Sequence, residues 1–202
     1  MERSKFMDLN NAYSAGKKLL CGGYSEYTPT GKAYFVKNNR YGKVPHIGDI
    51  AYFYHASAGR VAHVGIVIAV EKDGNSYSIK TVEGNTSTQA YERNGGGVAI
   101  KAYKFTILDV GGVHKINGFG TPKFSEDTCN AEIFVSVAKN EVGYLEKASD
   151  YQLESKTLNS GTNNYTKYGK WYHDNGAYWC QQFVSWCAYM ACVEYAAAHT
   201  TG

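Results

Sequence analysis

The sequence predicts an α+β fold in which a helix is followed by a run of antiparallel strands and then by further helices. Four apolar segments rich in β-branched residues follow one another between residues 50 and 105. The turn signal Asp73-Gly74 between two of them indicates a hairpin. Residues 179–198 instead carry apolar side chains at helical spacing. A chain of 202 residues is long enough to bury a sizeable core within one domain.

The first helix is expected over residues 6–22 and ends at Gly22-Gly23. A polar segment rich in tyrosine follows up to Gly48, with a turn signal at Pro29-Thr30-Gly31. The strands that come next are expected at 50–54, 61–70, 77–82 and 98–105, and the strand region closes near 118–122.

The second part of the chain is expected to be helical. A short polar hinge at 125–129 leads into a helix over 130–140, and the polar residues 144–178 are expected to form a long ordered loop with short helical turns. We therefore interpret residues 1–202 as a single domain made of a strand half (1–124) and a helix half (130–202).

The composition argues against several function classes. A net charge of +3 is too small to indicate nucleic-acid binding. No segment reaches the roughly 18 apolar residues of a membrane helix, and the first residues lack the apolar run of a secretion signal. The five cysteines show no paired framework and no C-x-x-C spacing, so we expect neither a disulfide scaffold nor a zinc site. They fit a chain made in a reducing cytosol.

Cys180 falls at the start of the last helix. Gly176 breaks the chain before it, and Phe183 and Cys187 continue an apolar stripe below it. A thiol in the first turn of a buried helix faces the positive end of the helix dipole and unpaired N–H groups, which favour a thiolate and can stabilise an oxyanion. The segment alone therefore allows two interpretations, a nucleophile or a small core residue. Cys187 and Cys192 lie deeper in the helix and are expected in the core.

His63 lies on the strand at 61–70. The alternating apolar residues of this strand form a core face, while His63 and Gly65 point to the opposite face. Gly65 is expected to leave space beside the imidazole. A lone histidine on a strand is more often structural, so its neighbours decide its interpretation.

The following strand supplies those neighbours. Glu83 and Asn85 are two residues apart and share one face. A two-residue turn at 73–74 sets His63 opposite Gly84, and a three-residue turn sets it opposite Asn85. Either register leaves a carboxylate and an amide beside the imidazole, which is the arrangement that orients a catalytic histidine and holds its tautomer.

Three segments carry these positions: residues 62–67 (AHVGIV), 82–87 (VEGNTS) and 178–187 (YWCQQFVSWC). Together they resemble the CHAP amidase family, papain-like cysteine amidohydrolases of the NlpC/P60 type that occur in phage endolysins and bacterial cell-wall hydrolases. The resemblance covers roughly residues 48–124 and 130–192. It implies a papain-like NlpC/P60 fold, in which an antiparallel sheet packs against a buried cysteine helix.

The resemblance also implies roles for the site residues. Cys180 would be the nucleophile, His63 the base, Glu83 the residue that orients His63, and Asn85 a fourth polar member of the site. The backbone N–H of Cys180 would contribute to an oxyanion hole. The implied reaction is cleavage of a peptidoglycan amide bond, either as an N-acetylmuramoyl-L-alanine amidase or as an endopeptidase of the stem peptide or cross-bridge.

The order of the motifs departs from the family. In the family the cysteine precedes the histidine, whereas here His63, Glu83 and Asn85 precede Cys180. The sequence is therefore similar to a circularly permuted member, in which the hinge at 125–129 joins the family's end to its beginning. Chain termini that lie close together tolerate such a change. We expect the two halves to form the site within one monomer, with a domain-swapped dimer as the alternative.

The resemblance also sets expectations about ligands. Some family members bind calcium before the cysteine, but residues 141–178 hold only Asp150 and Asp174, so no metal is expected, and no cofactor either. The expected partner is the peptidoglycan of a Gram-positive cell wall, reached by a protein made in the cytoplasm without a signal peptide, as a phage lysin is. The candidate substrate contacts are four aromatic residues near the cysteine: Tyr165, Trp171, Tyr178 and Trp179.

Two alternative functions stay open on the sequence. One is a papain-fold protease or amidase that acts on a protein substrate, as a toxin or effector does. The other is a cell-wall-binding module with a dead thiol site, although the presence of all four polar positions argues against it.

Overall fold

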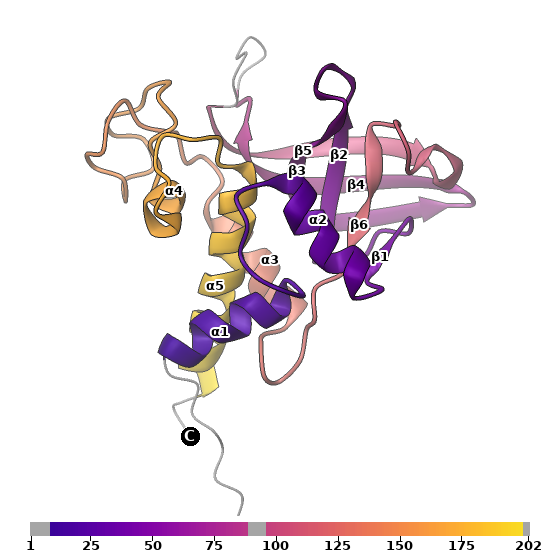
Figure 1. Cartoon of the computed structure of the whole chain (residues 1–202), viewed down its shortest axis with the longest axis horizontal. Coiled ribbons are helices and arrows are strands. Elements are labelled where there is room, and N and C mark those ends of the chain that lie inside the picture. The colour runs from indigo at the N-terminus through magenta and orange to yellow at the C-terminus, as the bar shows by residue number, and fades with distance from the viewer. Residues whose placement is uncertain (1–8, 89–95, 200–202) are drawn as a thin grey trace, which may run out of the picture.

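The computed structural model describes residues 9–88 and 96–199, which form an α+β fold with one antiparallel sheet (Figure 1). The six strands lie in the order β1-β6-β2-β3-β4-β5. Their bounds are β1 (Tyr41–Gly42), β2 (Ile50–His55), β3 (Arg60–Asp73), β4 (Ser76–Thr86), β5 (Gly97–Thr106) and β6 (Ile116–Gly120). The α-helices are α1 (Leu9–Leu19), α2 (Thr28–Lys37), α3 (Ala131–Asn140), α4 (Lys167–Tyr172) and α5 (Cys180–His199), and two short 3₁₀ helices are η1 (Ala56–Ala58) and η2 (Ile107–Asp109).

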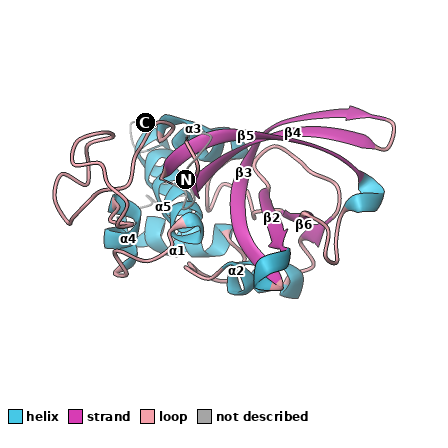
Figure 2. Cartoon of the chain, turned by 90° about the horizontal axis from the view of Figure 1, so that it is seen from above, coloured by secondary structure: helices cyan, strands magenta, loops and turns pink. Residues whose placement is uncertain are grey.

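The α5 helix is the centre of the helical layer. Figures 1 and 2 show α1 and α3 gathered around α5 at one end of the sheet, while the β4–β5 hairpin extends away from the helices. Buried residues of α5, β3 and β4, among them Phe183, Ile66 and Val82, share one core. The contact between β4 and α5 is close, because a Cβ built on Gly84 would lie 2.6 Å from Cβ of Phe183. A glycine in β4 therefore lets the helix that starts at Cys180 approach the sheet.

The α2 helix was not expected from the sequence. The turn signal Pro29-Thr30-Gly31 lies in its first turn instead of in a loop. Proline is common there, because a first-turn residue has no intrahelical partner for its N–H and the proline φ suits the helix. The α2 segment has no pronounced apolar stripe, so Pro29 and Gly31 were the stronger local signal, and they indicated a turn.

The β3–β4 hairpin turns one residue later than expected. Asp73 pairs with Ser76, so the turn consists of Gly74 and Asn75, and Gly74 has a φ of 57°. A register shift between Val67 and Ala69 then changes the pairing by one residue. Ile66 consequently pairs with Val82, which is the register that the three-residue turn implied. The β-bulge, not the length of the turn, produces this alignment at the end where His63 lies.

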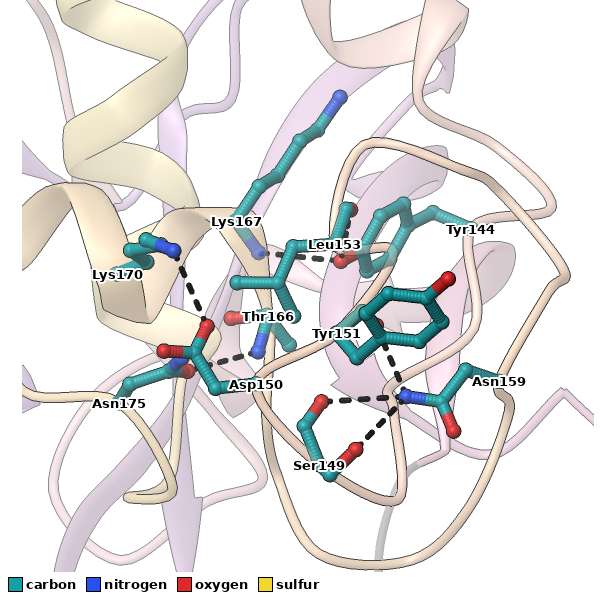
Figure 3. A network of polar contacts seen from close by, with 10 residues as sticks. All are labelled: Tyr144, Ser149, Asp150, Tyr151, Leu153, Asn159, Thr166, Lys167, Lys170 and Asn175. Atoms are coloured by element: carbon teal, nitrogen blue, oxygen red, sulfur yellow. Dashed lines mark hydrogen bonds and ion pairs between the residues drawn. The ribbon is translucent and has the colours of Figure 1, made fainter.

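The long segment between α3 and α5 is an ordered loop that contains α4, as the sequence predicted. Figure 3 shows how its side chains hold it. The amide of Asn159 donates hydrogen bonds to Oγ of Ser149 at 3.1 Å and to the carbonyl of Tyr151 at 2.9 Å. The backbone N–H of Thr166 donates to Oδ1 of Asn175 at 2.8 Å. These bonds order the chain that leads into Cys180.

Candidate active site

Cys180 is the first residue of α5 and lines a cleft of about 430 Å³ together with His63, Asn85 and Tyr178. Its side chain is largely buried, at 6% exposed, so the cleft is its access to a ligand. The start of α5 is fixed by the preceding residue: Trp179 is fully buried and its Nε1 donates to Oε2 of Glu146 at 3.2 Å. The thiol is thus held at a helix N-terminus, where the N–H groups of the first turn lack intrahelical partners.

His63 joins the two halves of the chain at this cleft. Its Nε2 lies 2.8 Å from Oε2 of Glu83, and the Cys180 thiol lies close enough to the ring to raise the pKa of His63. Because Nε2 faces Glu83, the other ring nitrogen, Nδ1, is left to face the sulfur. The side chain is 14% exposed, so it is shielded from bulk water but still reaches the cleft. A cysteine, an imidazole and a carboxylate therefore form a connected series, which is the arrangement that activates a thiol nucleophile.

Glu83 is buried and fully engaged by hydrogen-bond donors. Thr81 Oγ1 and Tyr103 OH each donate to Oε1 at 2.7 Å, and Thr86 Oγ1 donates to Oε2 at 3.2 Å. With His63, this makes four partners for one carboxylate. A buried charge is tolerated when it is paired and hydrogen-bonded in this way. The three supporting side chains were not predicted; Thr81 and Thr86 flank Glu83 in β4, but Tyr103 comes from β5 and had no local signal.

Asn85 reaches the cleft because β4 is irregular at this point. The pairing of β4 with β5 shifts between Glu83 and Thr86, and Asn85 has a φ of 52°. Asparagine is among the residues that adopt this left-handed conformation most readily. The bulge turns Asn85 into the cleft beside His63 and Cys180.

Gly65 leaves space on this face of β3, as predicted, but Glu83 fills it. A Cβ on Gly65 would lie 2.6 Å from Cγ of Glu83 and 3.1 Å from Cβ of Thr81. We expect Gly65→Ala to displace the Glu83 carboxylate from His63. The loss in kcat/KM should be on the order of 100-fold, the effect of a displacement of about 1 Å at a catalytic group.

A matched control exists in Gly42→Ala, because nothing lies within 4 Å of a Cβ built on Gly42. The experiment compares kcat/KM and thermal unfolding of the two variants. Equal activity of the two variants would show that the position of the Glu83 carboxylate does not depend on the absence of a side chain at Gly65.

The partners of His63 also determine its charge. Burial lowers the pKa of His63, but the hydrogen bonds to Cys180 and Glu83 and their charges outweigh it and raise the pKa to about 10. Burial raises the pKa of Glu83, but the hydrogen bond and the charge of His63 hold it below its usual value of 4.5. His63 therefore remains an imidazolium at neutral pH.

These pKa shifts link stability to pH in opposite directions. The raised pKa of His63 contributes stability that is fully present below pH 6.5 and is lost as the pH rises through about 10. The lowered pKa of Glu83 contributes stability above pH 4.5 that is lost as the pH falls through that lowered value. Both contributions are present together between about pH 4.5 and 6.5.

Of the four aromatic residues predicted to contact substrate, the structure places one in the cleft. Tyr178 lines it and is 68% exposed. Trp179 is a core residue stacked on Tyr168 with ring centroids 5.4 Å apart, so its prediction as a substrate contact is corrected. Trp171 lines a separate groove, and Tyr165 does not line the cleft.

Sequence reasoning missed the opposite wall of the cleft. It is formed by the segment before α2 and by the end of the β2–β3 hairpin, and the missed residues are Glu26, Tyr27, Thr28, His55 and Arg60. A signal was available for the hairpin end, because two basic side chains, His55 and Arg60, lie only a few residues before His63 in the sequence. In the structure they pair at the end of the hairpin. The segment before α2 had none, because only tertiary packing brings it there.

The other four cysteines are buried away from the cleft. Cys187 and Cys192 lie in the core of α5 as expected, and Cys129 lies in the same core. Cys21 has its sulfur 4.0 Å from the carbonyls of Leu19 and Thr121, and burial raises the pKa of its thiol. Within the described residues, no group of three or more His, Cys, Asp or Glu is placed to hold a metal ion, and no helix is long and apolar enough to cross a membrane.

A comparison with protein families identifies the first part of the chain. Residues 6–85 match the CHAP domain. CHAP proteins are cysteine- and histidine-dependent amidohydrolases and peptidases, so the resemblance inferred from the sequence is confirmed. No curated protein and no solved structure gave a match.

The CHAP match and the geometry point to different cysteines. The matched residues include His63, Glu83 and Asn85, but Cys21 is the one cysteine among them, and Cys180 lies outside. The structure places the thiol of Cys180, not that of Cys21, beside His63. The cysteine that lies next to His63 therefore follows it in the chain and falls outside the matched residues.

Proposed function

We propose that this protein is a peptidoglycan hydrolase in which Cys180 attacks an amide carbonyl with His63 as its acid–base partner. The observation that carries the proposal is the position of His63 between the Cys180 thiol and the Glu83 carboxylate, with His63 and Cys180 lining one cleft. CHAP domains typically act on peptidoglycan, which favours the cell wall as substrate. The bond cut is then either the N-acetylmuramoyl-L-alanine amide or an amide of the stem peptide or cross-bridge.

The reaction follows from the positions of these groups. The sulfur of Cys180, whose proton is held by the His63 imidazolium, forms a C–S bond with the carbonyl carbon, and the oxyanion is stabilised by N–H groups at the start of α5. His63 donates its proton to the leaving amine as the C–N bond breaks. A water molecule then gives a proton to His63 and attacks the thioester, which breaks the C–S bond, releases the carboxylic acid and returns Cys180 and His63 to their starting state. Glu83 holds the imidazole in orientation throughout, and Asn85 contributes a polar contact at the cleft.

We further propose that the chain is a circularly permuted, papain-like NlpC/P60 domain, residues 1–202, in which a single molecule forms the site. The packing of α1 against α5 supports this, because it brings the first and last described helices together (Figure 1). The side chains at this contact approach closely: the Tyr13 and Tyr189 rings have centroids 6.0 Å apart. The contact between His63 and Cys180 within one chain favours the monomer over a swapped dimer.

A cell-wall assay tests the proposed activity. We expect purified protein to clear a suspension of Gram-positive cell walls and to release new amino groups without new reducing sugar ends. The N-terminal residue that appears would name the bond. Amine release from a protein but from no wall would favour the alternative of a protease or amidase with a protein substrate, and release of reducing ends would contradict an amidohydrolase.

A further inference from the structure

The wall of the cleft opposite Cys180 carries a fixed guanidinium. Arg60 lines the cleft at the start of β3, two residues after the short helix η1. Its Nη1 donates to the carbonyl of Val61 at 2.9 Å, and its guanidinium carbon lies 4.9 Å from the centroid of the Tyr27 ring. One of its five N–H donors makes the bond to Val61, and the planar fork is held in place by both contacts.

The first turn of α2 lies beside this guanidinium. Thr28, the first residue of α2, donates its Oγ1 to the same Val61 carbonyl at 2.8 Å, so the helix start and Arg60 share one anchor. Tyr27, the N-cap, makes no side-chain hydrogen bond to the first turn. The start of α2 thus contributes a positive helix end to the wall that Arg60 already makes basic.

His55 lies on the same wall. It lines the cleft, and its ring centroid is 6.2 Å from that of His63. Burial lowers the pKa of His55, and the positive charges of His63, Lys115 and Arg60 lower it further, while the charge of Glu83 raises it. The lowered pKa keeps His55 an uncharged imidazole at neutral pH, so the positive charge of this wall rests on Arg60, and His55 adds a polar ring at the residue that pairs with it.

The acidic residue that lines the cleft is engaged by other groups. Glu26 lines the cleft, but its carboxyl is hydrogen-bonded to Asp174 and to the amide of Gln182. Burial and Asp174 raise the pKa of Glu26. Among the described residues, no ion pair joins Arg60 to a carboxylate. The charge of Arg60 thus has no acidic partner of its own in this wall.

We propose that Arg60, supported by the first turn of α2, binds a free carboxylate of the substrate peptide. Guanidinium groups bind carboxylates through two parallel hydrogen bonds, which gives geometric specificity as well as affinity. The carboxylate that we assign to Arg60 is the α-carboxylate of D-glutamate in the stem peptide, which some walls carry free and others as an amide. The inference rests on the proposed function: Cys180 defines the bond cut, and Arg60 defines which walls are preferred.

Two matched probes test the proposal. The acid probe is N-acetylmuramoyl-L-alanyl-γ-D-glutamyl-L-lysine with the C-terminal lysine carboxyl amidated, so that the α-carboxylate of D-glutamate is its one free carboxylate. The amide probe differs only in an amidated D-glutamate α-carboxylate. Both are titrated into Cys180→Ala protein, so binding is measured apart from hydrolysis. We expect the acid probe to bind roughly 10- to 100-fold more tightly, the range of a hydrogen-bonded charge pair. Arg60→Gln in the same background should reduce binding of the acid probe to the level of the amide probe.

Lys72→Gln is the matched control, because Lys72 is an exposed cation at the far end of β3 and does not line the cleft. It removes the same charge and should leave the preference intact, and Arg60→Lys should retain part of it. Equal affinity of both probes for Cys180→Ala protein, or a preference that survives Arg60→Gln, would overturn the proposal. Failure of wild-type protein to hydrolyse any wall would instead count against the proposed function, since the binding preference is read without hydrolysis.

Discussion

Cys180→Ala is expected to reduce the hydrolysis of cell walls by at least about 10⁴-fold, because removal of a covalent nucleophile leaves only the contribution of binding and of the oxyanion site. The thiol sits at the first residue of α5 and lies beside His63, so no other described cysteine can take its place. The measurement is the rate of amine release from walls, with thermal unfolding to show that the variant is folded. Alanine in this position removes one sulfur atom and should leave the fold unchanged.

Cys21→Ala is the control that makes this result decisive. Cys21 is the cysteine that lies inside the CHAP match, but it is buried against backbone carbonyls outside the cleft. We expect full activity from Cys21→Ala. An inactive Cys21→Ala protein that is folded, together with an active Cys180→Ala protein, would reverse the assignment.

Mixing Cys180→Ala with His63→Ala should restore no activity if each site is formed within one chain, whereas recovery would indicate exchange between chains.

The second large effect is expected from Glu83→Gln, with a loss in kcat/KM of about 10²- to 10⁴-fold. The side chain keeps its size, but one carboxylate oxygen becomes an N–H donor that faces either His63 and Thr86 or Thr81 and Tyr103. If it faces His63, Nε2 must accept, and the proton moves to Nδ1, which faces the thiol. Nδ1 then already carries a proton and cannot receive that of Cys180, so the imidazolium of the wild-type protein does not form in this way.

Glu83→Gln should also change the pH profile. The hydrogen bond and the charge of Glu83 are among the causes that raise the pKa of His63 to about 10. Without them the imidazolium deprotonates at lower pH. We therefore expect the alkaline limb of kcat/KM, near pH 10 in the wild-type protein, to move toward neutral pH in the variant.

Tyr103→Phe tests one hydrogen bond to Glu83 without removing the charge of the carboxylate. It removes one of the four hydrogen bonds to Glu83 but keeps the carboxylate. The expected cost is roughly 1 kcal/mol in the free energy of unfolding, with the alkaline limb of kcat/KM unchanged.

For Glu83→Gln, an alkaline limb that stays near its wild-type position would contradict the role of Glu83 in holding the charge of His63.

Several features of the site could be predicted from local sequence. The alternation along β3 predicted the face on which His63 lies, because side chains in a strand alternate by rule. The position of Cys180 at a helix start followed from Gly176 and the apolar stripe after it. Both patterns depend on residues that are close in the chain, and the structure retains them. Asn85 also lines the cleft, but the β-bulge between Glu83 and Thr86 brings it there, not the regular alternation that predicted it.

Other features depended on contacts between distant residues. Trp179 was predicted to contact substrate but lies in the core, because it bonds to Glu146 and stacks on Tyr168. The segment around Pro29 was predicted to be a turn but forms the first turn of α2, because it packs beside α5. A Cβ on Gly31 would lie 2.6 Å from Oε1 of Gln181. Local propensity is a weak determinant when packing opposes it.

The sequence by itself determined the members of the candidate site: Cys180 at a helix start, and a histidine beside a carboxylate on paired strands. Only the tertiary structure decided that Tyr103 supports the carboxylate of Glu83, and that Arg60 and the first turn of α2 line the same cleft. The physical reason is that Tyr103 meets Glu83, and Val61 meets Thr28, only when α2, α5 and the sheet have packed together. The periodicity of a single segment does not depend on that packing and cannot predict it.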